Sequence, residues 1–319
     1  MLIWTYNRAD EVEKSIKSVL NQTFQDFELV LVNNGSTDHT AKVLEKYQDH
    51  PKVRLFDIKE NRGAIGGMNF ALDQIHGEWF ATLGDHDEIV PHAFETLLRV
   101  VDDVDPTITA VTANAISSTT GELCGLGLDR DQYLPIEVIV NKTGGDFFGI
   151  TKTELLGGKR LNENLKGNAN AFWYQIDAIV NRYYIHQALK IFNTESGDTA
   201  TDEIRLMDIE MKSNRYHELA NETFFWKVLK EHNQLRFEAL CIRGYFFSKA
   251  SGDIKSMAIY SQMLNSGSIS FRYQSLFMII SHCPPLVLES IYRFIGITQI
   301  GHLMSNLIIK PFGRIGYLK

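Results

Sequence analysis

The stretch from Phe27 to Gln48, FELVLVNNGSTDHTAKVLEKYQ, carries the pattern that decides the fold. Its first six residues are nearly all apolar, as in a strand covered on both faces of a parallel sheet. The cluster NNGSTDHT follows, and it combines turn residues with side chains that can cap a helix. TAKVLEKYQ then continues as a helix. A buried strand, a polar turn and a helix in this order form one unit of an α/β sheet.

The same order of elements is repeated on both sides of this stretch. Strands are predicted at residues 1–6, 27–32, 53–58 and 78–83, and helices through residues 11–22, 40–48 and 68–76. This alternation covers about the first 115 residues and predicts a parallel α/β sheet. In such sheets ligands bind outside the carboxyl ends of the strands, where the polar and glycine-rich clusters of this sequence fall.

The composition argues against a nucleic-acid-binding protein. The chain has 319 residues and a formal net charge of −7, without the basic surplus typical of nucleic-acid binders. Its three cysteines, Cys124, Cys241 and Cys283, form neither a metal spacing nor a disulfide framework, which favours a reducing compartment. No secretory signal pattern opens the sequence. We therefore expect a cytoplasmic location.

Helical patterns dominate after about residue 205. The uncharged run from Phe294 to Ile309 is shorter than a membrane span. A packed terminal helix is one interpretation. A helix lying on the inner face of the cell membrane is the other, supported by the basic residues Arg293, Lys310, Arg314 and Lys319.

LGDHDEIVP, at residues 83–91, places three acids and a histidine directly after a predicted buried strand. Carboxylates crowded in this way repel one another and are costly to desolvate. A solvated acidic turn is one interpretation and a divalent cation site is the other. For an isolated Asp-x-Asp turn the solvated interpretation would be favoured, so the choice depends on the other motifs of the chain.

Three stretches share one family likeness: residues 5–40, ENRGAIGGMNFAL at 60–72 and GEWFATLGDHDEIVP at 77–91. In this order and spacing they resemble glycosyltransferase family 2, strongly to about residue 100 and more weakly over 145–205. The resemblance implies an inverting enzyme with a GT-A, Rossmann-like, mostly parallel sheet flanked by helices, and a mostly helical C-terminal extension.

The expected domain division follows from this likeness. A GT-A domain is expected over residues 1–205, with a nucleotide-sugar half at 1–115 and an acceptor half at 116–205. The helical extension is expected over residues 206–319.

The resemblance also implies a set of residues that contact the nucleotide sugar. These are Thr5, Tyr6, Asn7, Arg8, Asn34, Gly35, Ser36, Asn61, Gly63, Asn69, Asp85 and His86. The family commonly has an acid where Asn34 stands, and the Asn34 carbonyl can accept from a uracil N–H more weakly. A uridine nucleotide is expected, and Asn34→Asp is expected to keep or tighten its binding. Met68 replaces the family's usual arginine.

The segment Asp85-His86-Asp87 matches the family's DxD element, which holds Mn²⁺ or Mg²⁺ against the donor diphosphate. We expect Asp87 to be the direct metal ligand. Asp85 is expected to contact the ribose or a metal-bound water.

The general base is not evident in the sequence. The family has an acidic pair before an aromatic helix, but Asn168, Ala169 and Asn170 stand at that place. Asparagine is no base at neutral pH. The candidate bases are therefore neighbouring acids, Asp177, Asp202 and Glu163. Trp173 is the candidate stacking wall for the acceptor, with core packing as the alternative.

The expected function is transfer of a sugar, with inversion, from a nucleotide diphosphate sugar to a glycan or lipid-linked acceptor. Assembly of bacterial surface polysaccharide is the setting that the resemblance implies. The alternative is a catalytically impaired relative that binds a nucleotide sugar for an assembly or regulatory role. No nucleic-acid partner is expected, and the C-terminal tail is the candidate for peripheral membrane contact.

Overall fold

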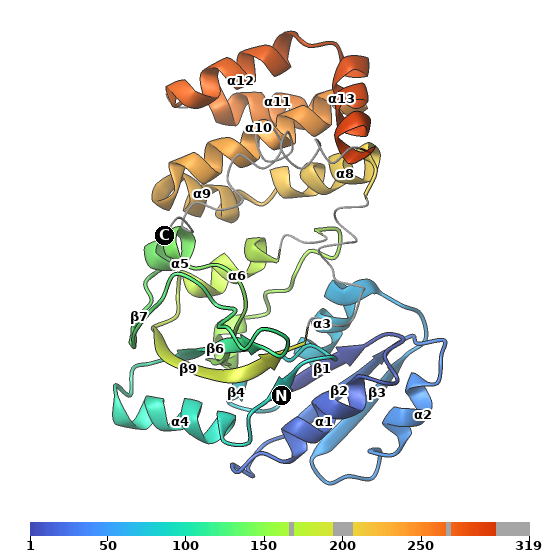
Figure 1. The fold of residues 1–319 in the computed structure, drawn as a ribbon, viewed down its shortest axis with the longest axis vertical. Coiled ribbons are helices and arrows are strands. Elements are labelled where there is room, and N and C mark those ends of the chain that lie inside the picture. The colour runs from blue at the N-terminus through green and yellow to red at the C-terminus, as the bar shows by residue number, and fades with distance from the viewer. Residues whose placement is uncertain (166–168, 194–206, 266–268, 298–319) are drawn as a thin grey trace. The chain divides into compact units, whose positions relative to one another are not determined.

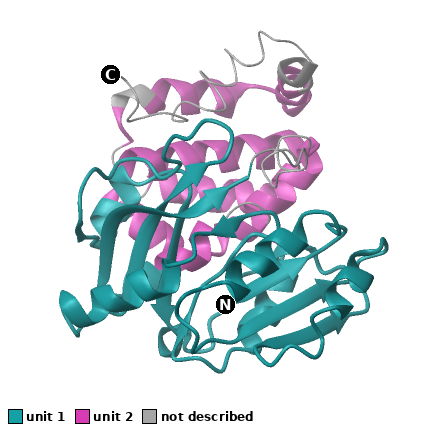
Figure 2. Ribbon diagram, turned by 60° about the horizontal axis from the view of Figure 1, so that its bottom comes forward, with its two compact units in different colours: residues 1–163, 175–197 teal, residues 164–174, 198–319 magenta. Residues whose placement is uncertain are grey.

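The computed structural model describes residues 1–165, 169–193, 207–265 and 269–297. The chain divides into two compact units, shown in separate colours in Figure 2. The first comprises residues 1–163 and 175–197, and the second comprises residues 164–174 and 198–319. All strands of the described structure belong to the first unit, and the domain division expected at residue 205 stays a proposal.

The N-terminal strands form a parallel sheet. They are β1 (Leu2–Thr5), β2 (Leu29–Asn34) and β3 (Val53–Ile58), in the order β1–β2–β3. Figure 1 shows them side by side, with α1 (Val12–Leu20) and α2 (Thr40–Glu45) alongside. The register pairs Thr5 with Asn33 and Asn33 with Asp57, so polar side chains from three strands meet at one edge.

Helix α1 forms because its apolar residues recur every three or four positions. Val12, Ile16 and Val19 share one face and are fully buried. They belong to the same core cluster as Leu29 and Leu31 of β2. All six residues of β2 are buried, which confirms that this strand is covered on both faces.

The remaining strands form a second sheet. They are β4 (Trp79–Phe80), β5 (Glu88–Ile89), β6 (Ala110–Ser117), β7 (Gln132–Tyr133), β8 (Phe147–Lys152) and β9 (Arg182–Phe192). The order is β4–β8–β6–β9–β5, and β7 also pairs with β9. Strands β6 and β9 are parallel, whereas β8 runs antiparallel to β6. The residue before β8 therefore lies at the edge where β6 and β9 end.

Backbone hydrogen bonds connect the two sheets. The Leu2 N–H donates to the carbonyl of Ala81 (2.9 Å), and the Leu83 N–H donates to the carbonyl of Leu2 (3.0 Å). A parallel bridge between Leu2 and Thr82 lies between these bonds. The fourth predicted strand thus lies beside β1, and it carries the Asp85-His86-Asp87 segment to the carboxyl edge.

The other helical elements of the α/β part are α3 (Gly63–Asp73), α4 (Ala93–Asp103), α5 (Ile136–Lys142), a 3₁₀ turn η1 (Thr153–Leu156) and α6 (Asn170–Asp177). Helix α3 begins five residues before the predicted start at Met68. Its first residue, Gly63, has φ +72° and donates its N–H to Oδ1 of Asn61 (2.7 Å). This side-chain acceptor lets the helix begin directly after the Asn61 turn.

The second unit contains a run of helices. They are α8 (Ile209–Ala220), α9 (Thr223–His232), α10 (Gln234–Ser251), α11 (Ile254–Asn265), α12 (Phe271–His282) and α13 (Pro285–Ile297). Asp208 caps α8 by accepting from the Met211 N–H (2.8 Å). Asn233 caps α10 by accepting from the Arg236 N–H (2.9 Å). The expected mostly helical C-terminal part is confirmed.

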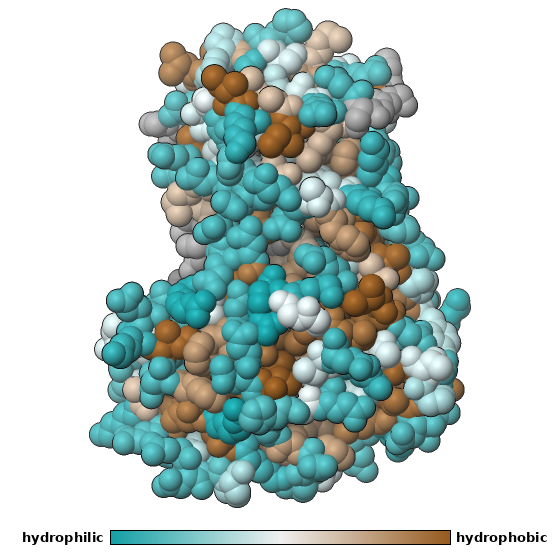
Figure 3. Space-filling model, turned by 180° about the vertical axis from the view of Figure 1, so that it is seen from behind, coloured by the Kyte–Doolittle hydropathy of each residue, from teal (hydrophilic) through white to brown (hydrophobic). Residues whose placement is uncertain are grey.

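Hydrophobic side chains reach the surface of the helical unit among hydrophilic ones (Figure 3). The most exposed are Leu286 (77%), Ile254 (73%), Ile279 (67%) and Met278 (60%). Within the described part of the chain no single helix is long and apolar enough to cross a membrane. Residues Tyr273–His282 and Pro285–Tyr292 meet that criterion only as a pair, and they are bent by 116°.

Candidate functional site

Asn7 organises the turn after β1. It has a positive φ of 52°, a conformation that asparagine tolerates better than most residues. Its Oδ1 accepts from the backbone N–H groups of Thr37 (2.8 Å) and Asp38 (3.3 Å). Its own N–H donates to Oγ of Ser36 (3.1 Å). Asn7 and Ser36, both predicted donor-site residues, therefore hold the turns after β1 and β2 together.

Tyr6 and Thr5 differ in accessibility at the same strand end. The Tyr6 side chain is exposed, at 39%, so its ring is available for stacking. Thr5 is 1% exposed, and its Oγ1 has no hydrogen-bond partner among the described residues. A base arriving at this edge would meet Tyr6 rather than the Thr5 side chain.

Asn34 ties β2 to the start of α3. Its Nδ2 donates to the Gly63 carbonyl (3.0 Å) and to Oδ1 of Asn61 (3.1 Å), and its Oδ1 accepts from the Arg62 N–H (3.2 Å). Because a backbone carbonyl lies on one side and a backbone N–H on the other, the amide has one orientation that satisfies both. The carbonyl predicted to read the base is therefore already bonded within the protein.

Gly35 is required by a close backbone approach. It has φ +76°, and a Cβ placed there would lie 2.4 Å from the Asn61 backbone nitrogen. A side chain at this position would therefore push the β2 turn away from the Asn61 turn. Gly35 and Asn61, both predicted donor-site residues, are thus neighbours in the structure.

Asn69 and Met68 have interior positions in α3. Asn69 is 6% exposed, and its side-chain amide pairs with the backbone of Leu161, accepting at 2.9 Å and donating at 2.8 Å. Met68, which stands in place of the expected arginine, is also 6% exposed. Both side chains therefore belong to the packing of α3. The donor-site role expected of Asn69 stays a prediction.

Glu163, a candidate base, lies beside the first turns of α3. Its Oε1 forms an ion pair with Arg62 (2.6 Å) and a longer contact with Nδ2 of Asn69 (3.3 Å). A Cβ on Gly66 would lie 2.9 Å from Oε2, so the carboxylate rests directly on this helix. Its carboxylate is thus held beside α3 by Arg62, and the role of base stays a prediction.

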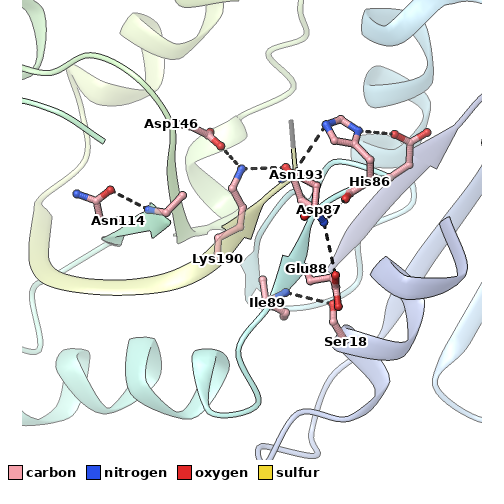
Figure 4. Close-up of polar contacts among 11 residues, drawn as sticks. Ser18, His86, Asp87, Glu88, Ile89, Asn114, Asp146, Lys190 and Asn193 are labelled. Atoms are coloured by element: carbon pink, nitrogen blue, oxygen red, sulfur yellow. Dashed lines mark hydrogen bonds and ion pairs between the residues drawn. The ribbon is translucent and has the colours of Figure 1, made fainter. Parts of the chain in front are cut away.

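Asp85, His86 and Asp87 form a charged cluster at the carboxyl edge of the strands, and Figure 4 shows His86 beside Asp87. Nδ1 of His86 lies 3.1 Å from Oδ1 of Asp85, and Nε2 lies 3.7 Å from Oδ1 of Asp87. The hydrogen bond with Asp85 and the charge of Asp87 raise the pKa of His86, against the opposing effects of burial and the charge of Arg8. The imidazole thus separates two carboxylates, and Arg8 acts on the same cluster.

Asp87 faces the protein interior. It is 3% exposed, and its Oδ2 lies 3.1 Å from Nζ of Lys190 in β9. Its Oδ1 accepts from the Asn193 N–H (3.0 Å), and Nδ2 of Asn193 donates to the His86 carbonyl (2.7 Å). Lys190 also forms an ion pair with Asp146, the residue before β8. Figure 4 shows Lys190 between the two carboxylates.

Lys190, Asn193 and Asp146 were not predicted from the sequence. The available signal was a lysine within the otherwise apolar stretch ALKIF, which the structure shows to be part of β9. Burial lowers the pKa of Lys190, but Asp146 and Asp87 outweigh this effect and raise it overall. The ammonium group is therefore charged at neutral pH and is the counter-ion of the cluster.

The cluster fits a divalent cation only in part. Among the described residues no group of three or more histidine, cysteine, aspartate or glutamate side chains is arranged to hold a metal. Both oxygens of Asp87 contact donors of the protein, and the role of direct ligand expected of Asp87 stays a prediction. Oδ2 of Asp85 makes no hydrogen bond or ion pair in the described chain, and one carboxylate with substrate phosphates is a common way to hold Mg²⁺.

Asp177 lies at the other end of β9 from the cluster. Its Oδ1 forms an ion pair with Arg182 (2.8 Å), the first residue of β9. Burial raises the pKa of Asp177, and Arg182 opposes this rise. Residues 182 and 190 are eight positions apart in β9, which is at most roughly 26 Å at the usual rise per residue. This placement gives no support to Asp177 as the base.

The remaining predicted residues fall elsewhere. Trp173 is half-buried in α6, and its ring contacts Phe172 edge to face (5.0 Å between centroids). It belongs to the second unit. Asp202 lies outside the described residues.

Known proteins resemble this chain in sequence. Residues 1–126 match the family model for glycosyl transferase family 2. The GalNAc(5)-diNAcBac-PP-undecaprenol beta-1,3-glucosyltransferase of Campylobacter jejuni is 28% identical over 88% of this chain and 91% of its own length. The teichoic acid poly(glycerol phosphate) polymerase of Staphylococcus epidermidis is 26% identical over 60% of this chain, which spans 27% of that protein.

The fold has solved counterparts as well. S. aureus TarS 1-349 in complex with UDP-GlcNAc aligns with 92% of this chain and 90% of its own, with a TM-score of 0.64 and 14% identity. This likeness concerns the fold, and it confirms the GT-A architecture expected from the sequence. The match to glycosyl transferase family 2 thus lies in residues 1–126, which include β1, β2, β3 and the Asp85-His86-Asp87 segment.

Proposed function

We propose that this glycosyltransferase moves a sugar, with inversion, from a UDP-sugar to a glycan or lipid-linked acceptor in the assembly of a bacterial surface polysaccharide. One observation carries the proposal. The exposed Tyr6 ring and the Asp85-His86 face, on which Arg8 acts, belong to one strand-end edge of the first unit. This edge offers an aromatic surface, a carboxylate and cationic groups to a nucleoside diphosphate.

The side chains at this edge have distinct tasks in the proposed reaction. Tyr6 stacks on the base, and its exposed ring needs no rearrangement to do so. Asp87 and Asp85 would hold Mn²⁺ or Mg²⁺. When bound, that ion neutralises charge on the leaving diphosphate. His86 and Arg8 place further positive charge near the same phosphates, in place of the arginine that Met68 replaces.

The acceptor is proposed from the likeness in sequence. The Campylobacter jejuni relative, by its name, acts on an undecaprenol-linked substrate. The residues that flank the break between α12 and α13 include Met278, Ile279, Leu286 and Val287, which are 45–77% exposed. Such a surface suits contact with lipid. We propose that the protein is cytoplasmic and binds the membrane peripherally through this part.

The general base remains a proposal among Glu163, Asp177 and Asp202. Inverting transfer needs a carboxylate on the face opposite the leaving diphosphate. Glu163 and Asp177 are both ion-paired to arginines. This observation favours the second candidate function, a relative that binds a nucleotide sugar without turning it over.

Binding and transfer should be measured separately. Thermal stabilisation by UDP, GDP and CDP, each with and without Mn²⁺, tests the donor; stabilisation by UDP that depends on the cation supports the proposal. Stabilisation by another nucleotide but not by UDP would show that the base is wrong. Transfer from UDP-sugars to a polyprenyl-diphosphate glycan, followed by mass spectrometry, then separates an enzyme from a binding protein.

The candidate bases can be tested in the same assays. Glu163→Gln, Asp177→Asn and Asp202→Asn are compared for UDP affinity and for transfer. A base variant keeps its UDP affinity and loses transfer by at least about a hundredfold. If the wild type transfers sugar and none of the three variants behaves in this way, the base lies outside this group.

A further inference from the structure

Three basic side chains of the second unit lie within electrostatic range of one another. Lys212 and Arg215 are three residues apart in α8, which places them on the same side of this helix. Arg243 belongs to α10, and the Ser251 hydroxyl of α10 donates to the Ser213 hydroxyl of α8 (2.6 Å), so the two helices are in contact. Lys212, Arg215 and Arg243 are called the basic cluster below.

The basic cluster has more cations than the fold neutralises. Within the described part of the chain, neither Lys212 nor Arg243 forms an ion pair. Nε of Arg243 is buried and has no hydrogen-bond partner there. Asp208 is one turn before Lys212, but its carboxylate caps α8 at the Met211 N–H (2.8 Å). Buried cationic groups are usually paired with an anion, so the cluster offers a position to an anion from outside the chain.

Aromatic rings border the ammonium group of Lys212. Nζ lies 4.7 Å from the ring centroid of Tyr292 in α13 and 5.9 Å from that of Phe247 in α10. The three members of the cluster are each partly exposed, so an anion can reach them from solvent. Burial lowers the pKa of Lys212 to about 8, and Arg215 and Arg243 add to this effect. A bound anion would relieve this repulsion, and poor solvation strengthens its attraction.

Helix α13 joins the basic cluster to an exposed apolar surface. Tyr292 borders the cluster, whereas Leu286 (77% exposed) and Val287 (45%) lie at the start of the same helix. Tyr292 follows Val287 by five residues, a rise of roughly 8 Å along the helix. An anionic group in the cluster and an apolar chain attached to it can therefore both contact α13.

We propose that the basic cluster binds the diphosphate group of the lipid-linked acceptor, and that the prenyl chain of this acceptor lies along the exposed start of α13. The inference rests on the proposed function for the nature of the acceptor. Several cations are needed to compensate the charge of a diphosphate, and a guanidinium group binds phosphate oxygens through paired N–H groups. The helical unit thus has a ligand of its own.

Calorimetry with farnesyl diphosphate, a short isoprenyl diphosphate, tests the site. Lys212→Met and Arg243→Gln should each raise Kd at least about tenfold, whereas Lys212→Arg should stay within about threefold of the wild type. The matched control is Lys227→Met, which removes an exposed lysine of α9 that pairs with Glu231 (4.0 Å) and should change Kd less than about twofold. Equal losses in Lys212→Met and the control overturn the proposal, as does a wild type that binds no farnesyl diphosphate.

Three further probes identify the source of the phosphate. Inorganic pyrophosphate should bind at least about tenfold more weakly than farnesyl diphosphate, because it lacks the apolar chain. The affinity for UDP and the binding to phosphatidylglycerol vesicles should be the same in Lys212→Met and the wild type. Equal affinity for pyrophosphate would indicate a site for free anions, loss of UDP binding a donor site, and loss of vesicle binding a headgroup site. Each of these results overturns the proposal.

Thermal unfolding separates a binding role from a structural one. Since Lys212 lies beside two other cations, Lys212→Met without ligand should keep its Tm or gain up to about 3 °C. Farnesyl diphosphate should then raise the Tm of the wild type and not that of the variant. A fall of about 5 °C or more in unliganded Lys212→Met would indicate that the lysine serves the packing of the helices, which counts against the proposal.

Sugar transfer distinguishes failure of this inference from failure of the proposed function. If the wild type transfers no sugar but binds farnesyl diphosphate through the basic cluster, the proposed function fails and the diphosphate site stands. If the wild type transfers sugar and Lys212→Met has the wild-type KM for a polyprenyl-diphosphate acceptor, the proposed function stands and the diphosphate site is wrong. A raised KM for this acceptor with an unchanged UDP affinity supports both.

Discussion

Two polar clusters occupy the strand-end edge of the first unit, and they are stabilised in different ways. Over β1 to β3 the cluster is built from asparagines, namely Asn7, Asn33, Asn34 and Asn61. Over β4, β8 and β9 it is built from charges, namely Asp85, His86, Asp87, Asp146 and Lys190. An amide both donates and accepts, so asparagines can satisfy one another and the nearby backbone.

The carboxylates of the charged cluster cannot satisfy one another's hydrogen bonds in this way. A carboxylate only accepts, and a buried one needs a counter-charge from another part of the chain. A neutral hydrogen bond contributes about 1 kcal/mol, whereas breaking a buried ion pair costs about 3–5 kcal/mol. Loss of one hydrogen bond in the asparagine cluster therefore costs little stability. The charged cluster depends on Lys190 of β9 for the counter-charge of Asp87 and Asp146.

The largest expected loss of stability comes from a substitution that breaks the charged cluster. Lys190→Ala leaves Asp87 and Asp146 without their cation and should lower the free energy of unfolding by about 3–5 kcal/mol. Urea denaturation at pH 7 measures the loss. The double variant Lys190→Ala/Asp87→Asn should be more stable than Lys190→Ala, since it removes one unpaired charge. A loss below about 1 kcal/mol in Lys190→Ala would mean that the pair is not important for folding.

The next largest loss of stability is expected from a substitution that breaks the asparagine cluster. Asn34→Asp points a carboxylate oxygen at two acceptors, the Gly63 carbonyl and Oδ1 of Asn61, and should lower the free energy of unfolding by about 1–3 kcal/mol. The sequence alone led us to expect that this change keeps or tightens uridine binding, so UDP affinity is measured on the same variant.

Asn61→Asp is the matched control for that substitution. Oδ1 of Asn61 only accepts in this network, from the Gly63 N–H and from Asn34, and a carboxylate keeps that role. Its stability should change by no more than about 0.5 kcal/mol. Equal losses in the two variants would show that charge at this edge, rather than hydrogen-bond direction, sets the stability.

A smaller difference tests the close approach of the two turns. Gly35 and Gly63 have nearly the same φ, +76° and +72°, but a Cβ would clash only at Gly35. Alanine at either position carries the left-handed strain of about 1–2 kcal/mol, and Gly35→Ala should lose more because the Asn61 backbone must also move. Thermal unfolding of both variants measures the difference, which should be absent if the turns can separate freely.

The smallest effect concerns a cation whose neighbours are also cations. In the second unit, burial lowers the pKa of Lys212 to about 8, and the charges of Arg215 and Arg243 add to this. The unfolded chain therefore binds more protons between about pH 8 and the model-peptide value of 10.5, so stability due to Lys212 rises with pH across this window. Below it, the folded protein carries the cost of the buried charge.

The comparison with Lys212→Met isolates this contribution. Urea denaturation at pH 7.5, 9 and 10.5 should show wild-type stability rising relative to the variant. Parallel pH profiles, or a relative fall, would contradict the lowered pKa. The result would sharpen the comparison with Lys190, whose carboxylate neighbours shift its pKa in the other direction.

Much of the strand-end edge could be predicted because it depends on local patterns. Apolar runs followed by polar turns mark the carboxyl ends of β1, β2 and β3, and Asp85 follows the fourth predicted strand in the same way. Lys190 and Asp146 could not be placed, because their proximity to Asp87 depends on which strands pair. Asp146 in particular precedes its strand, and only the antiparallel direction of β8 brings it to this edge.

The predictions for Asn34 and Asp177 depended on side-chain contacts between elements that are separate in the sequence. Whether Asn34 offers a free carbonyl depends on the approach of Gly63 and Arg62 from another turn. The Asp177–Arg182 pair joins the end of a helix to the start of a strand, so helical spacing gives no signal for it. Such contacts between separate elements decide whether an acid is available as a base, and a single sequence does not encode them in a readable form.

The irregular pairing of β6 with β9 has a consequence for how related chains should be aligned. Ala113 lies opposite Ile185 and Ala115 lies opposite Lys190, so β9 holds three more residues than β6 over this interval. Since side chains alternate between the faces of a strand, deleting one residue here would bring Ile191 opposite Ala115 and turn the lysine to the other face. The number of residues between Ile185 and Lys190 is thus as important as their identity, and a relative that keeps the lysine but changes this length would lose its ion pairs with Asp87 and Asp146.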